Sequence, residues 1–226
     1  MPEAPNAVRE LAEDATSRKK FLAHAGGTGV AASLAAFIAA CGGDDMSSSS
    51  KATPAATTMA SGKSSTEQFG EGDLGIANYA LTLEYLEADF YAKVANSGML
   101  KGKLLDTARR FGNEEQAHVD ALIALITKAG GKAASKPKAQ FPLDNEKAIL
   151  KLAATVENLG ANAYLGQAGR IKDKEILAAA LSIHSVEARH AAVLNLATGA
   201  KPAQGPFAMP ASADEVLKAV KPFLAT

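Results

Sequence analysis

Two short segments decide the fold of this chain: EQAH at residues 115–118 and EARH at residues 187–190. Each has a glutamate and a histidine three residues apart, inside an otherwise apolar helical stripe. That spacing places both side chains on one face of an α-helix, and a face that packs against a core normally excludes charged groups. We therefore expect two helices that turn matching polar pairs toward a shared interior.

Two further glutamates repeat in the same way. Glu84 and Glu157 each interrupt an apolar stripe, and each is followed seven residues later by a tyrosine, Tyr91 or Tyr164. The order of a lone glutamate with its tyrosine and then Glu-x-x-His therefore occurs twice along the chain. A single Glu-x-x-His motif occurs by chance in many helical proteins, but two complete copies predict two helix hairpins related by a pseudo-two-fold axis.

Four glutamates in the middle of a helical interior need a counter-charge, because an isolated buried carboxylate is too costly to leave ionised. Two divalent metal ions would neutralise four ionised glutamates. Carboxylate oxygens with one imidazole for each metal suit iron or manganese, and these ligand types do not distinguish the two metals. The pattern thus predicts a two-metal site between the hairpins.

The rest of residues 73–226 indicates an all-α bundle. Alanine is abundant and tryptophan is absent, which favours helices over sheets. We expect four long helices and a short fifth, at about 73–97, 103–129, 145–171, 174–198 and 213–224. Pro137 and Pro142 exclude a helix from the linker at 130–144. Fully extended, this linker reaches about 50 Å, more than the ~37 Å of a 25-residue helix, so it can set the third helix parallel to the second.

The N-terminal part of the chain is of a different kind. Residues 1–41 have a basic start and then a small, apolar run, as an export signal does. Residues 17–22 resemble a twin-arginine signal, with Lys19 in place of the second arginine. The IAAC run that ends at Cys41 resembles a bacterial lipobox, which implies that Cys41 is lipidated; an uncleaved membrane helix is the alternative. Residues 42–72 are expected to form a flexible tether.

This interpretation predicts a bacterial lipoprotein outside the cytoplasm, with the domain at 73–226 held to the membrane through its lipid anchor. The formal net charge is +0 and no basic stretch is interleaved with aromatic residues, so nothing points to nucleic acid. Cys41 is the single cysteine, which excludes an internal disulfide and a cysteine-based metal cage. A homodimer is expected because bundles with exposed side faces often pair.

Residues 78–91, NYALTLEYLEADFY, resemble the first helix of the ferritin-like group that includes desiccation-related proteins. The resemblance covers most of the folded part and implies a ferritin-like four-helix bundle with two iron ions, or alternatively two manganese ions. It assigns the metal ligands to Glu84, Glu115, His118, Glu157, Glu187 and His190. Glu115 and Glu187 are then the bridges. Tyr91 and Tyr164 lie near the metals as hydrogen-bond donors or redox-active groups, with ordinary packing as the alternative.

Two residues break the pseudo-symmetry. Glu87 lies three residues after Glu84, where the matching position in the third helix is Gly160. His184 lies three residues before the second Glu-x-x-His motif, where the matching position is Gly112. Either residue is a candidate extra ligand, which would favour peroxide handling as in rubrerythrin-like proteins. The alternative, which we favour for both, is a polar residue at the edge of a helix.

The leading functional hypothesis is oxidation of Fe(II) by O₂ or H₂O₂, as a ferroxidase or in peroxide detoxification. The sequence has no cysteine cluster to supply electrons, so a peroxidase would depend on an external electron donor. One alternative is a dimanganese catalase that disproportionates H₂O₂. Another is a surface protein of stress or desiccation without catalysis, with a structural metal or none.

Overall fold

The computed structural model describes residues 65–225 of the 226-residue chain. The predicted export signal, with Cys41, and most of the predicted tether lie outside the described residues. The described part contains five α-helices and two short 3₁₀ helices, in the order η1 (Ser65–Phe69), α4 (Gly72–Asn96), α5 (Gly102–Lys128), α6 (Glu146–Ala168), α7 (Lys174–Ala197), α8 (Ala213–Val220) and η2 (Lys221–Phe223). The predicted all-α bundle with a short fifth helix is confirmed.

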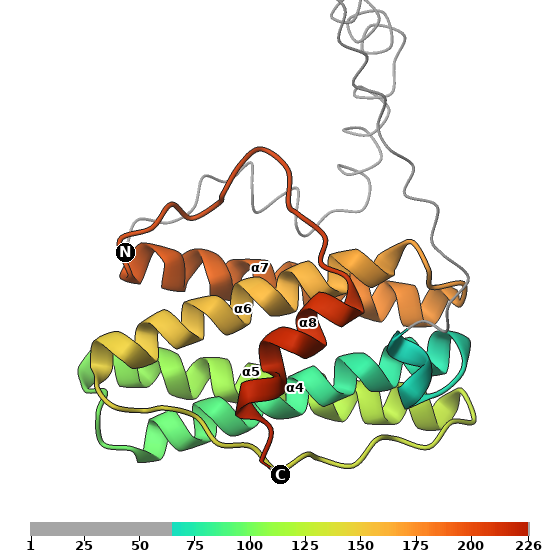
Figure 1. Cartoon of the computed structure of the whole chain (residues 1–226), viewed down its shortest axis with the longest axis horizontal. Coiled ribbons are helices and arrows are strands. Elements are labelled where there is room, and N and C mark those ends of the chain that lie inside the picture. Colours follow the sequence, from blue (N-terminus) through green and yellow to red (C-terminus); the bar gives the residue numbers. More distant parts are fainter. Residues whose placement is uncertain (1–64, 226) are drawn as a thin grey trace, which may run out of the picture. The chain divides into compact units, whose positions relative to one another are not determined.

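The four long helices form two hairpins, α4 with α5 and α6 with α7 (Figure 1). The chain between the hairpins runs back along the length of the bundle, so α6 points in the same direction as α5 (Figure 1). This is the predicted crossover. Gly130 and Gly199 leave α5 and α7 with φ of 79° and 80°, a backbone conformation that glycine adopts without strain.

The third long helix ends at Ala168, earlier than the predicted residue 171. Gly169 is the C-cap of α6. Asp173 then starts α7, because its side chain accepts hydrogen bonds from the amides of Glu175 and Ile176. Asp73 of α4 also accepts from the amides of Lys172 and Asp173. The segment that links α6 to α7 is therefore a turn fixed by two aspartates.

The end of the predicted tether packs against the bundle. Thr66 of η1 is 2% exposed, and the rings of Phe69 and Tyr79 have centroids 5.9 Å apart. The tether predicted for 42–72 therefore extends too far, because Ser65–Phe69 belong to the folded part. The folded part thus begins before α4. The sequence did not show this, because the segment before Ser65 has low-complexity composition.

The short α8 crosses α4 and α6 (Figure 1), where Val216 and Val220 pack with Tyr79 and Ala163. Its start shows a capping box between Ser212 and Glu215. The chain after α8 meets the crossover through an isolated antiparallel bridge between Ala139 and Leu224. None of the helices in the described part has the length and apolar character needed to cross a membrane.

The interior of the bundle has an apolar cluster toward each end. One cluster includes Ile76, Leu122 and Ile176, and the other includes Phe90, Phe111 and Ile149. The buried glutamates lie in the helix segments between these two clusters. The fold therefore holds a belt of polar groups between two apolar regions.

Candidate metal centre

The structure brings together all six side chains that the sequence proposed as ligands. Two groups have ligand atoms within 4.8 Å of one another: Glu84, Glu115, His118 and Glu187 in one, and Glu115, Glu157, Glu187 and His190 in the other. All four glutamates are 0% exposed. Glu115 and Glu187 belong to both groups, which is the arrangement expected for carboxylates placed between two ions.

His118 points its Nδ1 atom at three carboxylates. This atom lies 3.2 Å from Oε2 of Glu84, 3.0 Å from Oε2 of Glu115 and 3.3 Å from Oε1 of Glu187. The three glutamates come from α4, α5 and α7. One imidazole nitrogen therefore converges with oxygens from three helices on a small volume.

His190 is the counterpart of His118 in the second group. Its Nδ1 atom lies 2.8 Å from Oε1 of Glu115 and 3.3 Å from Oε2 of Glu157. Its outer Nε2 atom lies 2.7 Å from Oε2 of Glu114, and the ring of Phe111 stacks on it with centroids 3.8 Å apart. A carboxylate on the outer nitrogen orients a ligating histidine and fixes which nitrogen faces the metal.

The sequence did not identify Glu114 as a partner of His190. It directly precedes Glu115 but points about a quarter turn away from it on α5. Its side chain is 33% exposed and also contacts Arg110, as an ordinary surface residue does. A second glutamate next to a predicted ligand could have indicated a supporting residue. The contact of Glu114 with His190 of α7, however, depends on how α5 and α7 are placed.

The two tyrosines bind the lone glutamate of the opposite hairpin. The hydroxyl of Tyr164 donates to Oε1 of Glu84 at 2.5 Å, and the hydroxyl of Tyr91 donates to Glu157. Burial, together with the neighbouring carboxylates, raises the pKa of both tyrosines well above the ordinary value. Both therefore stay protonated and act as donors that hold one oxygen of each glutamate.

The ionisable groups of the belt differ in the direction of their pKa shifts. Burial alone would raise the pKa of Glu115, but the adjacent rings of His118 and His190 outweigh it and lower that pKa to about 2. Burial alone would lower the histidine pKa values, yet the close carboxylates raise them to about 12 for His118 and about 11 for His190. Burial raises the pKa of Glu84 to about 7. Without metal, Glu115 is thus the carboxylate that pairs with both imidazolium groups.

Several buried atoms in the belt have no hydrogen-bond partner among the described residues. They are Glu87 Oε2, Glu115 Oε1, Glu157 Oε2, Glu187 Oε1, Glu187 Oε2 and His190 Nδ1. Buried polar atoms in proteins are normally satisfied. Except for Glu87, these atoms belong to the two converging groups, where carboxylate oxygens face the Nδ1 atoms of His118 and His190. A metal ion would take the place of the protons that these nitrogens hold. The residues therefore fit two metal ions with carboxylate and imidazole ligands.

Glu87 is buried beside the cluster without belonging to either converging group. The helix-edge interpretation of Glu87 is wrong, because its side chain is 3% exposed. Burial and the charge of Glu187 raise its pKa well above the ordinary value. A Cβ atom on Gly160 would lie 2.8 Å from Oε1 of Glu87 and 2.8 Å from Oε2 of Glu187. Gly160, the pseudo-symmetric counterpart of Glu87, thus leaves space for the Glu87 carboxylate.

His184 lies apart from the cluster. Its Nδ1 atom is 3.0 Å from the backbone oxygen of Ala161, to which it donates. Its side chain belongs to neither converging group. His184 therefore contacts the backbone of α6, in line with the helix-edge interpretation.

We expect Gly160→Ala to weaken metal binding without unfolding the protein. The new methyl group must displace the carboxylates of Glu87 and Glu187, and such a displacement lowers metal affinity by about tenfold to a hundredfold. Alanine also improves helix propensity by about 1 kcal/mol, so the metal-free protein should keep its stability. Calorimetric titration with Mn(II) and urea unfolding measure the two effects.

Gly169→Ala is the matched control, because a Cβ atom there meets nothing within 4 Å. It should leave metal affinity unchanged. Equal affinity in Gly160→Ala and Gly169→Ala would show that the space opposite Glu87 has no influence on metal binding.

The comparisons with known proteins agree with this architecture. A family model for a ferritin-like domain matches residues 72–200. No curated protein matches the chain. The crystal structure of a conserved hypothetical protein from Mycobacterium tuberculosis matches with a TM-score of 0.51 and 20% identity, over 60% of this chain and 96% of that one. That of a hypothetical protein from Methanococcus jannaschii has a TM-score of 0.45 and 16% identity, over 64% and 91%. At these identities, the first likeness shows a shared fold.

Proposed function

The chain belongs to the ferritin-like domain family, and on that premise we propose that it is a di-iron carboxylate protein that oxidises Fe(II) with O₂ or H₂O₂. The observation that carries the proposal is the convergence of four glutamates and two histidines into two groups that share Glu115 and Glu187. The ligand set is complete, since each group offers an imidazole and three carboxylates.

Bound iron would supply one-electron redox chemistry. In the proposed reaction two Fe(II) ions are the electron donors and each becomes Fe(III). One O₂ takes the two electrons and two protons and leaves as H₂O₂. When H₂O₂ is the oxidant, it takes two electrons and two protons, its O–O bond breaks, and two water molecules leave. No other reductant is needed while Fe(II) is supplied.

The chain's own residues have separate tasks in this proposal. Glu115 and Glu187 belong to both groups, so they would help to hold both ions. Tyr91 and Tyr164 hold one oxygen each of Glu157 and Glu84, which leaves the other oxygen free for metal. Glu114 holds the outer nitrogen of His190. These contacts would hold the ligands in place when metal is bound.

We place this activity on the outer side of the cell membrane. The support is the export-like segment before Cys41 and the lipobox-like run that ends there. A lipidated Cys41 would hold the domain at the membrane surface through the segment that follows it.

The test loads the full metal-free chain with Fe(II) under anaerobic conditions and then adds O₂ or H₂O₂. We expect about two irons per chain, the number of converging groups, and a near-ultraviolet ferric absorption band after either oxidant. The variant Glu84→Gln should lose part of the iron, and Asp106→Ala, an exposed residue of α5, should keep it. A chain that binds no iron would refute the proposal.

Manganese is the second candidate, because carboxylate and imidazole ligands bind it as they bind iron. Rapid evolution of O₂ from H₂O₂ by the Mn-loaded chain, without oxidation of Fe(II) by the iron-loaded chain, would replace the proposed function with a catalase-like one.

A further inference from the structure

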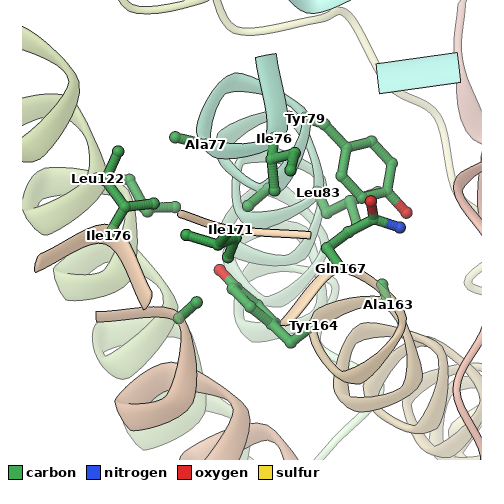
Figure 2. A pocket seen from close by; sticks show the side chains of 12 residues that line it. Ile76, Ala77, Tyr79, Leu83, Leu122, Ala163, Tyr164, Gln167, Ile171 and Ile176 are labelled. Atoms are coloured by element: carbon green, nitrogen blue, oxygen red, sulfur yellow. The ribbon is translucent and has the colours of Figure 1, made fainter. Parts of the chain in front are cut away.

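Two small apolar cavities border the metal cluster, one toward each end of the bundle. The first has a volume of about 20 Å³ and is lined by Tyr164 (Figure 2). The second has a volume of about 60 Å³ and is lined by Tyr91. We call them the Tyr164 cavity and the Tyr91 cavity. Each is enclosed by all four long helices.

The two cavities are related by the same pseudo-symmetry as the ligands. Ile76 and Ala80 line the Tyr164 cavity, and Ile149 and Ala153 line the Tyr91 cavity at the same spacing in sequence as Glu84 and Glu157. Leu122 and Leu194 correspond in the spacing of the two Glu-x-x-His motifs. The two cavities therefore lie at equivalent places in the two hairpins. A chance packing defect would occur in one hairpin only.

Each tyrosine is shared between a cavity and a ligand. Tyr164 lines its cavity and donates to Glu84 (Figure 2 shows its ring beside Ile171). Tyr91 lines the other cavity and donates to Glu157. A molecule in either cavity is thus separated from a ligand carboxylate by one aromatic ring.

The lining determines what can occupy these cavities. The Tyr91 cavity is formed by aliphatic and aromatic side chains, apart from Thr107, whose hydroxyl donates within α5 to Lys103. The Tyr164 cavity is less apolar, because it has at its edge Gln167 and Tyr79, whose hydroxyl has no hydrogen-bond partner among the described residues (Figure 2). The lining of the Tyr91 cavity disfavours H₂O₂, because a buried polar molecule without hydrogen-bond partners is costly, and apolar cavities stay dry while they bind apolar guests.

The surroundings of the two cavities also differ. The residues that line the Tyr164 cavity are all buried. The Tyr91 cavity is bordered by Val193, which is 48% exposed, and by Ala197. The larger cavity is therefore separated from solvent at one side by partly exposed residues of α7.

We propose that both cavities bind dioxygen beside the metal cluster, with the Tyr91 cavity as the more occupied one. This inference rests on the proposed function and makes O₂, rather than H₂O₂, the oxidant that the protein collects. O₂ is a small apolar molecule that needs no hydrogen-bond partner. Its presence next to Tyr91 would place it one ring away from Glu157.

The test uses O₂ itself on the full metal-free chain, so it does not depend on iron. O₂ is paramagnetic and speeds the relaxation of methyl groups that it contacts. Methyl spectra recorded under O₂ and under argon should show the largest changes at Ile149 and Leu194, with smaller ones at Ile76 and Leu122. Val216 is 0% exposed and lines neither cavity, so it gives the reference. Changes no larger than those of Val216 would overturn the inference.

Filling each cavity gives matched variants. Ala153→Leu should reduce the O₂ effect at Leu194 to the level of Val216 and leave Leu122 unchanged, and Ala80→Leu should do the reverse. If Ala153→Leu does not fold, Ala108→Val fills the same Tyr91 cavity with less added volume.

The same variants distinguish the oxidants in iron-loaded protein. Ala153→Leu should slow Fe(II) oxidation by O₂ and leave oxidation by H₂O₂ at the wild-type rate. An equal loss with both oxidants would overturn the inference. An O₂ effect in the methyl spectra of a chain that binds no iron would refute the proposed function while leaving the cavities as gas sites.

Discussion

Replacing Glu115 with alanine is expected to remove both metal ions at once and to destabilise the metal-free protein. Glu115 belongs to both converging groups, so its loss takes a ligand from each. Its oxygens lie 3.0 Å from His118 and 2.8 Å from His190. Removing one partner of a buried ion pair costs about 3–5 kcal/mol. We expect a value near the lower end, because Glu84 and Glu157 remain close to the two rings.

Metal content by mass spectrometry and urea unfolding of the metal-free chain measure the two effects. Asp106→Ala is the control, because Asp106 is exposed on the same helix and belongs to neither converging group. Two metals retained in Glu115→Ala would show that Glu115 is not shared between the ions. Loss of metal without loss of stability would show that the histidines are neutral in the metal-free protein.

Metal loading is expected to stabilise the protein, and increasingly so as the pH rises. A ligand present at a thousand times its Kd stabilises the native state by about 4 kcal/mol. For a domain of this size that corresponds to a rise in Tm of roughly 8–16 °C. Metal binding requires deprotonated ligands, so affinity increases with pH.

The metal-free protein should show the opposite trend. The folded-state pKa values of about 12 for His118 and about 11 for His190 exceed the ordinary 6.5. The folded state therefore keeps protons that the unfolded state releases, and the stabilisation, complete below pH 6.5, is lost as pH rises toward these values. Glu84 has a folded-state pKa of about 7 against an ordinary 4.5, so it also lowers the stability of the metal-free protein as pH rises between these two values. Glu115, with a pKa of about 2, acts in the opposite direction, and only below 4.5.

Thermal unfolding of the full chain across this range, with Mn(II) and with chelator, checks both trends. The difference in Tm between the two series should widen steadily from acidic to alkaline pH. A constant difference would mean that the histidines and Glu84 do not change protonation when metal binds. No difference at any pH would mean that the cluster binds no metal.

The sequence was sufficient for the architecture because that information is local. Three-residue spacing places Glu115 and His118 on one face whatever their neighbours are. Glycine and proline mark where helices end, and the length of the segment at 130–144 permits a crossover. The structure and the family match confirm the ferritin-like four-helix bundle.

The sequence alone determined the helices, their order, the crossover and the six residues that face inward, because helical periodicity and repetition are written along one chain. Tertiary structure alone decided which groups touch across helices. Three features are of this second kind. Glu114 pairs with His190, each tyrosine donates to the glutamate of the other hairpin, and Gly160 leaves space for Glu87. They depend on how each packed helix is rotated and shifted relative to its neighbours. A shift of a few ångströms would break every one of these contacts and leave the sequence pattern unchanged.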